Sequence, residues 1–434
     1  MKNNKKIVFF LDHKHRDLLS TVKISNYLKD KKFKVKIVPQ WKFNIVNQFD
    51  PKFIVLGKNN IHDFEKIRWK LEGRKIISIP NENFYVKNID KIDIACDLNF
   101  YWNKNTKNQQ KITNKKIVVG SPRTDFIKKR SHQLKEKIIT FALPPSKQEL
   151  KKKIDLIKFS KAQQKKIFKK KQSVLAFDEI SRGRNIVDKI INWAPLLSKK
   201  FKNIHFHLKP HPNDNIFFWL DIEKKFKKLK NFKIVYGIDI FTFLKKSSLH
   251  IAAEGCTTVF ESISSKIPTA EIVSNKGITR RMFFNHQLGL CLNKINSIDE
   301  VDKLIKKINL KKQIVSTNNT LMNNYIKKNF YKIDGNRCYE YADQINEFAN
   351  KQVYFNKILN FLNLFIEIIK VKKIIYLKFF LKLCIKKIFK FKLNYPDFKH
   401  IKVNKFTKID KTGRYDSRIK SSDIAFAEKK IRSL

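Results

Sequence analysis

The sequence predicts an α/β protein whose chain forms two parallel sheets, one after the other. Short apolar strands alternate with amphipathic helices through the first third of the chain, and a second series of this kind begins at Ile138. The strands are too uniformly apolar to lie half-exposed, which is typical of parallel sheets covered by helices on both faces. Two successive series of similar size therefore indicate two facing Rossmann-like domains, with a C-terminal amphipathic helical segment after them.

The strands of both series follow one another at the spacing of βα units. In the first series, residues 17–30 predict a helix whose leucines, valine and isoleucine face the sheet. The second series ends near Val273. The predicted strands are 7–11, 35–38, 53–56, 75–79 and 116–119 in the first series, then 138–143, 204–208, 232–236, 249–253 and 269–273 in the second.

Composition divides the chain into four parts. We expect an N-terminal domain at 1–130, a second domain at 131–350, a basic amphipathic helical segment at 351–393 and a poorly ordered polar tail at 394–434. Between the domains, the lysine-rich stretch 146–171 predicts a solvated surface helix or insertion.

The amphipathic segment permits two interpretations. Across 353–392, Asn, Glu and Lys recur at three- or four-residue steps, and Leu, Ile and Phe fill a wide apolar side. No run of about eighteen uncharged apolar residues occurs, so we expect no membrane span. The lysine edge suits the cytoplasmic surface of an anionic membrane. The alternative is a helix packed across the two domains or in a dimer interface.

The net charge of +56 favours polyanionic partners such as nucleic acid, anionic lipid or nucleotide-linked substrates. Lys, Asn, Ile and Phe all have codons rich in A and T, and glycine is scarce at 10, so genome composition accounts for much of the lysine. The chain carries no zinc spacing, RNP strand or KH-type loop. We expect no specific nucleic acid as a partner, and a basic nucleic-acid-binding protein is the alternative from a different class.

The five cysteines are odd in number and far apart in the sequence. No Cys-x-x-Cys pair occurs, so neither a zinc site nor a disulfide framework is indicated. A reducing cytoplasm fits this usage. The apolar run 7–11 is too short for a signal peptide.

One stretch of the second series predicts a binding site. Residues 250–268 indicate a buried strand, a tight turn at Glu254-Gly255, and a helix that opens at Thr257-Thr258. A helix start with hydroxyls and bare backbone N–H groups binds anions. Glu261 lies one turn further along, within reach of a sugar hydroxyl.

A second loop points to the same ligand. Lys209-Pro-His211-Pro212 follows another apolar strand, and strand-end loops at one edge of a parallel sheet share one crevice. A basic loop and a hydroxyl-bearing helix start would therefore face one phosphate together.

These residues resemble the C-terminal half of GT-B glycosyltransferases. That family typically has a Gly turn, then Ser or Thr, then Glu, then a Gly-x-Pro-type turn. Here Gly255, Thr257-Thr258 and Glu261 occupy the first positions, and Lys266-Ile-Pro268 forms the last turn without its glycine.

Three further segments resemble proteins of surface-carbohydrate biosynthesis, so that the likeness spans roughly residues 5–345. The first strand and its Asp12…Arg16-Asp17 loop are similar to their opening. Gly120-Ser-Pro-Arg123-Thr-Asp125 is similar to their Gly-x-Pro-Arg-x-Asp segment. The stretch 334–343 is similar to their Asp-Gly…Arg-Ile-Ala ending, with Tyr341 in place of the arginine.

The resemblance implies a transferase that uses a nucleotide sugar as substrate and needs no cofactor and no catalytic metal. The leaving diphosphate would be held by cationic and N–H groups. The donor-binding candidates are Lys209, His211, Glu254, Gly255, Thr257, Thr258 and Glu261. His211, fixed in an extended loop before a proline, is the leading catalytic candidate on this side.

On the acceptor side, Asp12 is the candidate for the base that takes the acceptor hydroxyl proton. His13, Asp17 and Glu82 compete with it. Arg16 and Arg123 either bind acceptor charge or pair with Asp17 and Asp125.

The sequence therefore predicts a cytoplasmic glycosyltransferase that acts on a growing surface polysaccharide or a lipid-linked acceptor. It leaves open whether the enzyme is peripheral at the inner membrane face. A nucleotide-sugar epimerase and a polyol-phosphate transferase are alternatives on the same fold.

Overall fold

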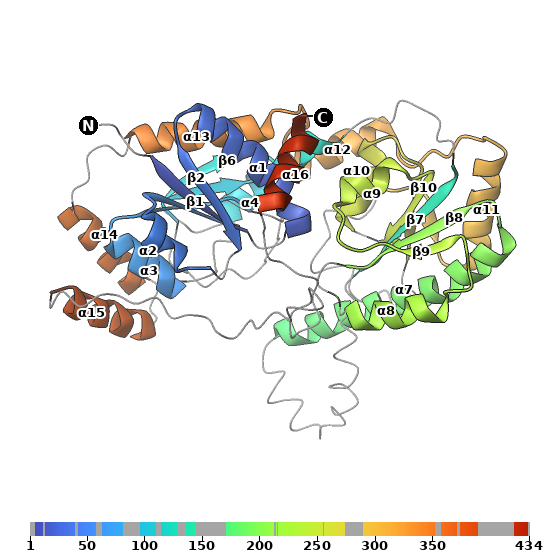
Figure 1. Cartoon of the computed structure of the whole chain (residues 1–434), viewed down its shortest axis with the longest axis horizontal. Coiled ribbons are helices and arrows are strands. Elements are labelled where there is room, and N and C mark those ends of the chain that lie inside the picture. Colours follow the sequence, from blue (N-terminus) through green and yellow to red (C-terminus); the bar gives the residue numbers. More distant parts are fainter. Residues whose placement is uncertain are drawn as a thin grey trace, which may run out of the picture. The chain divides into compact units, whose positions relative to one another are not determined.

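The computed structural model divides into two compact units, each built on its own parallel sheet (Figure 1). The first unit combines residues up to Phe126 with described residues from Ile326 onward, and the second covers described residues from Ile127 to Tyr325. The structure describes residues 5–11, 14–39, 42–57, 63–80, 96–109, 114–127, 136–144, 171–211, 214, 216–254, 256–273, 290–351, 357–370, 374–388 and 421–432.

The sheet of the first unit has six parallel strands in the order β2-β1-β3-β4-β5-β6. They are β1 (Lys6–Leu11), β2 (Lys34–Pro39), β3 (Phe53–Leu56), β4 (Lys75–Ser78), β5 (Leu98–Tyr101) and β6 (Lys115–Val118). The helices of its N-terminal part are α1 (Lys14–Asp30), α2 (Ile45–Phe49), α3 (Asp63–Leu71), α4 (Lys104–Gln109) and the 3-10 helix η1 (Pro122–Phe126). From β1, the chain adds β2 on one side and then β3 to β6 on the other, so the strand order reverses between β1 and β3.

The second sheet also has six parallel strands, in the order β12-β11-β10-β7-β8-β9. They are β7 (Ile138–Ala142), β8 (His205–Lys209), β9 (Phe232–Ile234), β10 (Leu249–Ala253), β11 (Thr269–Ile272) and β12 (Lys294–Ile295). Counted within this unit, the order is that of dinucleotide-binding Rossmann sheets. The expected fold class of two Rossmann-like domains is thus confirmed by strand order and direction.

Helices cover the second sheet and close its core. They are α7 (Lys171–Lys200), α8 (Ile216–Lys225), α9 (Ile240–Lys245), α10 (Thr257–Ser264), α11 (Ile298–Asn309) and α12 (Asn319–Asn329), the last of which carries the chain back to the first unit. The core joins Phe141, Phe206 and Ile251 of the strands to Ile190 of α7 and Trp219 of α8. Burial of such side chains on both sides explains why these strands are apolar throughout.

Most predicted strands are confirmed to within about two residues at each end, but β5 and β12 were not predicted. The sequence of β5 is short and polar at its centre, since Asn99 lies between Leu98 and Phe100. Asn99 is nevertheless buried, and its side-chain amide donates to the carbonyl oxygen of Cys96 at 2.8 Å. A strand of two residues such as β12 carries no periodic signal.

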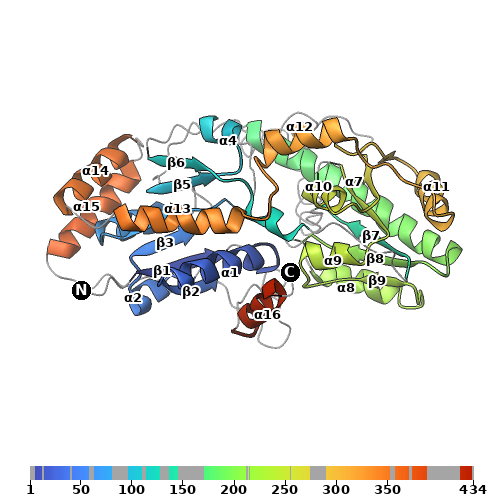
Figure 2. The ribbon, with the colours of Figure 1, turned by 90° about the horizontal axis from the view of Figure 1, so that it is seen from above.

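The chain after Ile326 returns to the first unit, although the sequence analysis placed residues up to 350 with the second domain. The helix α13 (Arg337–Lys351) lies beside α1 in both views (Figures 1 and 2). Tyr27 and Tyr339 pack edge to face with ring centroids 5.3 Å apart, and Lys31 pairs with Asp343 at 2.7 Å. Side-chain contacts made far along the chain therefore set this boundary.

The segment expected as a polar tail contains a packed helix, α16 (Ser421–Arg432). Its Ile424, Ala427 and Ile431 share one helical face and contact Leu18 and Val22 of α1. Ion pairs at both ends of the contact, Lys14 with Asp423 and Lys29 with Glu428, hold it beside α1 (Figure 2). The description of the tail as poorly ordered is therefore wrong for residues 421–432.

The expected amphipathic segment forms two helices, α14 (Lys357–Lys370) and α15 (Ile374–Ile388). Both pack against α3 of the first unit through Leu364, Ile368, Phe380 and Leu383, which surround Ile67. Among the described residues, none of the helices combines the length and apolarity required to cross a bilayer.

Candidate functional site

The candidate site lies at the carboxyl edge of the second sheet. In the register of the strands, Ala142 at the end of β7 pairs with Lys209 on one side and with Ala252 on the other. The loops that follow β8 and β10 therefore leave the sheet at the same level, with β7 between them. As predicted, the basic loop at Lys209–His211 and the start of α10 lie at one edge of one sheet.

The start of α10 occupies the topological switch point of this sheet. The chain runs from β7 through β8 to β9 in one direction and from β10 through β11 to β12 in the other. Ligands of open α/β sheets bind outside the carboxyl ends of the strands where the order reverses. β10 ends at Ala253 beside that point, and α10 begins at Thr257.

The first turn of α10 offers hydrogen-bond donors to an anion. Cys256 is at the N-cap position with an extended backbone, and a thiol is a weak acceptor for capping. Thr257 and Thr258 follow, and both are half-buried. The N–H groups of a first helical turn generally lack a carbonyl acceptor in the helix. In α10 the N–H of Val259 donates to the carbonyl oxygen of Cys256 at 3.1 Å, so those of Thr257 and Thr258 are the donors to consider, and the helix dipole adds partial positive charge.

A buried imidazole holds Thr258 in place. His250 of β10 is completely buried, and its Nε2 forms a hydrogen bond of 3.0 Å with Oγ1 of Thr258. Its Nδ1 bonds Oγ1 of Thr140 at 3.0 Å, and Thr140 bonds Ser247 at 2.7 Å. Burial lowers the pKa of His250 to about 3, so the ring is neutral at physiological pH. The sequence analysis did not assign His250 a role, although a histidine inside an apolar strand was the available signal.

The acidic residues of the predicted site are buried. Glu254 is 6% exposed and Glu261 is 5% exposed. Lys294 lies 3.9 Å from Glu254 and also pairs with Glu271, which is fully buried on β11. Beneath α10, burial and the neighbouring carboxylates raise the pKa of Tyr325 well above its ordinary value. Lys294, Glu271 and Tyr325 were missed, because nothing local in the sequence links them to α10.

The basic loop is ordered next to β8. Lys209 and His211 are half-buried and described, whereas Gly255, Pro212 and Asn213 lie outside the described residues. Asp214 accepts a hydrogen bond from Nε1 of the buried Trp219 at 3.2 Å, and its backbone N–H donates to the carbonyl oxygen of His211 at 2.9 Å. These two hydrogen bonds connect the loop to α8, and they hold the backbone of His211 in position.

On the acceptor side, three of the four candidates for the base lie outside the described residues. They are Asp12, with its neighbour His13, and Glu82. Asp12 follows β1 in the chain, and β1 ends where the order of the first sheet reverses. Asp17 is described, is 3% exposed, and accepts hydrogen bonds from Arg16 at 2.7 and 3.1 Å. Arg16 therefore pairs with Asp17, which was one of the two roles considered for it.

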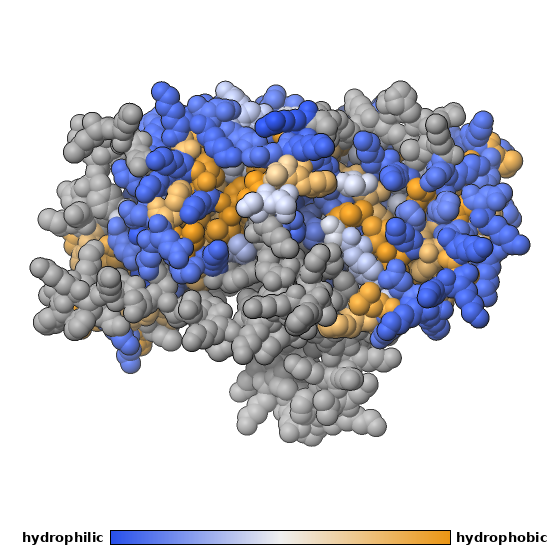
Figure 3. Space-filling model, in the orientation of Figure 1, coloured by the Kyte–Doolittle hydropathy of each residue, from blue (hydrophilic) through white to orange (hydrophobic). Residues whose placement is uncertain are grey.

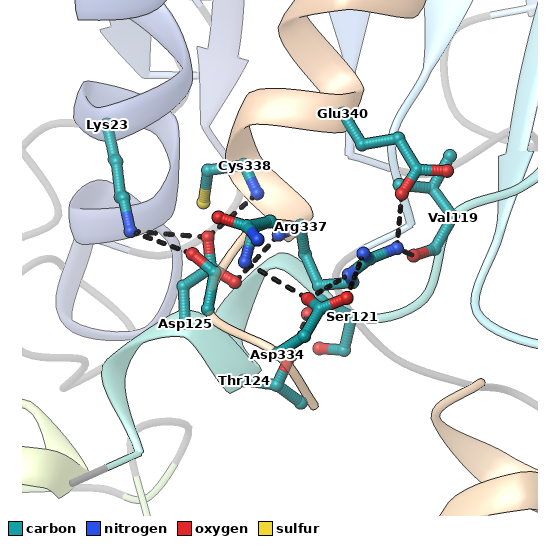
Figure 4. A network of polar contacts seen from close by, with 11 residues as sticks. Lys23, Val119, Ser121, Thr124, Asp125, Asp334, Arg337, Cys338 and Glu340 are labelled. Carbon is teal, nitrogen blue, oxygen red and sulfur yellow. Dashed lines mark hydrogen bonds and ion pairs between the residues drawn. The ribbon is translucent and has the colours of Figure 1, made fainter. Parts of the chain in front are cut away.

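The two motifs that resemble surface-carbohydrate proteins meet in the first unit (Figure 4). Asp125 of η1 accepts hydrogen bonds from the backbone N–H groups of Arg337 and Cys338, each at 2.8 Å, and pairs with Lys23 of α1 at 3.3 Å. The guanidinium of Arg337 is buried and donates to the carbonyl oxygen of Val119 at 2.9 Å. Asp125 thus caps α13, whereas Arg123 is half-buried in η1.

Tyr341, the departure from the family pattern, belongs to the same network. Its hydroxyl donates to the carbonyl oxygen of Gly120 at 2.8 Å. Gly120 has a φ of +94°, and a Cβ at this position would lie 2.7 Å from the carbonyl oxygen of Phe330. The motif Gly120–Asp125 therefore joins the two parts of the first unit.

Comparisons with known proteins give likenesses of fold. No protein-family model matches the chain. No curated protein sequence matches it either. Among solved structures, the chain is similar to the UDP-GlcNAc 2-epimerase from Neisseria meningitidis bound to UDP-GlcNAc, at 11% identity and a TM-score of 0.46, over 79% of this chain and 100% of that chain.

Two further structures show the same likeness. A UDP complex of MnaA from S. aureus has 11% identity and a TM-score of 0.47, over 81% of this chain and 99% of that chain. MurG from Acinetobacter baumannii has 9% identity and a TM-score of 0.40, over 79% of this chain and 99% of that chain. The fold assignment made above stands on strand order and direction alone.

The described part of the chain shows neither a metal-binding cluster nor a reactive thiolate. There, no group of three or more His, Cys, Asp or Glu side chains is arranged to hold a metal ion. All five cysteines are free thiols. Burial raises the pKa of Cys96 to about 11 and that of Cys291 to about 12, so neither is a thiolate at neutral pH.

A groove of about 640 Å³ lies at the opposite, amino-terminal edge of the second sheet. Lys137, Lys200 and His205 line it. Lys200 pairs with Asp302 at 2.8 Å, and Lys137 donates to Asn309 at 3.0 Å. These lysines thus form contacts at the protein surface. The groove is also far along the strands from the topological switch point, which lies at the carboxyl edge of the sheet, so we do not assign it as the candidate site.

Proposed function

We propose that the chain is a glycosyltransferase that moves a sugar from a nucleotide-sugar donor to a growing surface polysaccharide or a lipid-linked acceptor. One observation supports this most directly. A helix that begins with two threonines stands at the switch point of a Rossmann-ordered sheet, and a Lys-Pro-His loop leaves the same edge two strands away. That combination suits a ligand that carries phosphate at one end.

In this proposal, the second unit holds the donor. The first-turn N–H groups of α10 and the hydroxyl of Thr257 donate to the diphosphate, while His250 keeps Thr258 in position. Lys209 and His211 supply positive charge as the leaving group separates. Glu261, on α10 itself, accepts hydrogen bonds from the ribose, and the burial of its side chain shields that contact from water.

On the acceptor side, we propose Asp12 as the base. Asp17 is buried and bound by Arg16, so its carboxylate is poorly accessible to an acceptor hydroxyl. Asp17 is therefore a poorer candidate for the catalytic base, whereas His13 and Glu82 are still alternatives to Asp12. The free thiols agree with a reaction in the reducing cytoplasm.

A ligand screen followed by product analysis tests the proposal. Nucleotides and nucleotide sugars are screened for thermal stabilisation, which is about 2.7 kcal/mol at a hundred times the dissociation constant. The best donor is then incubated with and without acceptor glycans. Transfer requires both substrates, whereas an epimerase converts the donor alone and a polyol-phosphate transferase needs a different donor. Failure of all nucleotides to stabilise the chain would overturn the proposal.

Retention of binding in high salt separates a pocket from a basic surface. Non-specific binding to nucleic acid decreases steeply as salt is raised, because phosphate contacts release counterions. A nucleotide held in a site at a helix start is screened far less. A chain that binds only nucleic acid, and only at low salt, belongs to the alternative class.

A further inference from the structure

The helices α14 and α15 have one face that is fixed to the first unit. Leu364 and Ile368 of α14 and Phe380 of α15 are almost fully buried against Ile67 of α3. Glu367 of α14 forms an ion pair with Lys70 of α3 at 2.7 Å. Glu367 is the one acidic residue in α14 and α15, and it is engaged by Lys70 in this ion pair.

The opposite face of both helices is apolar and exposed. On α14, the spacing of Leu362, Ile366 and Ile369 places them away from the buried Leu364 and Ile368. Large apolar side chains are normally scattered singly over a protein surface. Here the exposed ones on this face are Leu362, Ile366 and Ile369 on α14, and Ile374, Leu381 and Ile385 on α15. We call this set the hairpin face. Figure 3 shows some apolar side chains, in orange, at its left side, where Figure 1 places α14 and α15.

Lysines border the hairpin face without acidic neighbours on the same helices. The sequence of α15 holds four lysines and no acidic residue. Lys378 and Lys382 are exposed, and Lys378 shares a helical stripe with Ile374, Leu381 and Ile385. Since Glu367 is used by Lys70, the exposed face carries apolar groups and positive charge together.

We propose that the hairpin face docks on a membrane surface that contains anionic lipid. Apolar side chains flanked by lysines enter the boundary between headgroups and acyl chains, while the lysines meet lipid phosphates. With 14 and 15 residues, the two helices are shorter than the about 20 residues of a membrane span, so they would lie along the surface. This inference is independent of the proposed transfer reaction.

Charge argues against a second copy of the chain as the occupant. A two-fold dimer would place the hairpin face of one copy on that of its partner. The lysines of the two α15 helices would then be brought together with no acidic residue to pair them. An anionic surface, by contrast, complements both the lysines and the apolar groups.

Co-sedimentation of the full chain with lipid vesicles tests the proposal. Vesicles of phosphatidylcholine alone are compared with vesicles in which about a third of the lipid is phosphatidylglycerol, at low and high salt. We expect at least about tenfold tighter binding to the anionic vesicles, and a loss of binding as salt rises. Point variants are preferred to a chain ending near residue 350, because that truncation would expose Ile67 and leave Lys70 without Glu367.

Two sets of variants make the test specific. Leu362→Glu with Ile366→Glu and Ile385→Glu should weaken vesicle binding more than about tenfold. The control set Leu196→Glu, Leu310→Glu and Val315→Glu, whose side chains are also about half-exposed or more, should not. Lys378→Glu with Lys382→Glu should weaken it about 25-fold or more, at about fivefold for each lysine. Lys303→Glu with Lys307→Glu on α11 has the same spacing and serves as its control.

Three outcomes would overturn the proposal. Hairpin variants that sediment like the parent chain would exclude this face, and equal losses in the control sets would show that net charge alone binds lipid. A parent chain that dimerises in solution, and becomes monomeric only in the apolar hairpin variant, would assign the face to a second copy. If the apolar variant does not fold, the variant Lys378→Glu with Lys382→Glu still tests the proposal, because it changes only exposed, charged side chains.

Discussion

The carboxylate of Asp125 caps a helix that begins at Arg337, 212 residues later in the chain. Both oxygens are used, because Oδ1 accepts from the backbone N–H of Arg337 and Oδ2 from that of Cys338, each at 2.8 Å. Lys23 of α1 lies 3.3 Å from the same carboxylate, so three segments converge on one side chain (Figure 4). This contact joins α13 to η1 and α1.

Replacement of Asp125 by alanine should therefore destabilise the first unit. Two backbone N–H groups lose their acceptor and Lys23 loses its partner, for which we expect a cost of about 2 kcal/mol. The control is Asp343→Ala, which removes a more exposed pair with Lys31 and should cost less than about 1 kcal/mol. Urea denaturation measures both, and equal effects would show that the cap is not important for stability.

The glycines at 120 and 335 form a matched pair. Both have positive φ, +94° and +78°, but a Cβ at Gly120 would lie 2.7 Å from a backbone oxygen, whereas nothing lies within 4 Å at Gly335. Gly335→Ala should cost about 1 kcal/mol through backbone strain alone. Gly120→Ala should cost at least about 1 kcal/mol more, because Phe330 must move. Thermal unfolding of the two variants checks the order, and a reversed order would contradict the close packing at Gly120.

The neutral state of His250 predicts a dependence of stability on pH. Its pKa is lowered from 6.5 to about 3 by burial, so between these values the unfolded chain binds a proton that the folded chain does not. The free energy of unfolding should therefore decrease as pH falls from 6.5 towards 3, by about 1.4 kcal/mol per pH unit from this group. His250→Asn should be less stable at pH 7 but should lose stability less steeply on acidification.

Urea titrations at several pH values measure this difference between His250→Asn and the parent chain. Parallel curves would mean that His250 does not titrate as its burial implies. His207, whose pKa burial lowers to about 4, contributes to both chains and cancels in the difference.

Opposite ends of β8 provide a test of the donor site. His211 follows the carboxyl end of this strand, and His205 begins it at the amino end. We expect His211→Ala to weaken nucleotide binding by about 1.5–3 kcal/mol, as for a hydrogen bond to a charged group. His205→Ala should leave the affinity unchanged. Calorimetric titration with the best nucleotide decides, and unchanged affinity in both variants would place the site elsewhere.

The same experiment with Glu261→Gln examines the proposed ribose contact. Glutamine has nearly the same shape, so the buried position is not emptied. We expect weaker binding of nucleosides and little change for inorganic diphosphate, because only the nucleoside carries the ribose. An equal loss for both ligands would indicate that Glu261 acts by supporting α10.

The ion pair between Lys70 and Glu367 should be important for attachment of α14. Lys70→Met alone leaves Glu367 without this partner at a partly buried site, which should cost about 3 kcal/mol. Adding Glu367→Leu should recover most of that loss, since two apolar side chains replace both charges. A double-mutant cycle by urea denaturation measures the coupling, and strictly additive effects would contradict it.

The sequence by itself determined the strands other than β5 and β12, their parallel arrangement and the start of α10. These features depend on local patterns: Ile7–Leu11 is continuously apolar, Leu249–Ala253 is apolar apart from His250, and Thr257-Thr258 opens a helix directly after a turn. Their physical basis is short-range, since burial on both faces of a sheet requires apolar runs and helix starts favour hydroxyls.

Only the tertiary structure decided which distant residues share a contact. Asp125 and Arg337, Tyr341 and Gly120, Lys70 and Glu367, and His250 with Thr140 meet through packing of segments far apart in the sequence. The tertiary structure also decided that α13 and α16 belong to the first unit, and which faces of α14 and α15 are packed or exposed. Hydrogen bonds and ion pairs between distant residues depend on where the chain places them, and no local pattern records that placement.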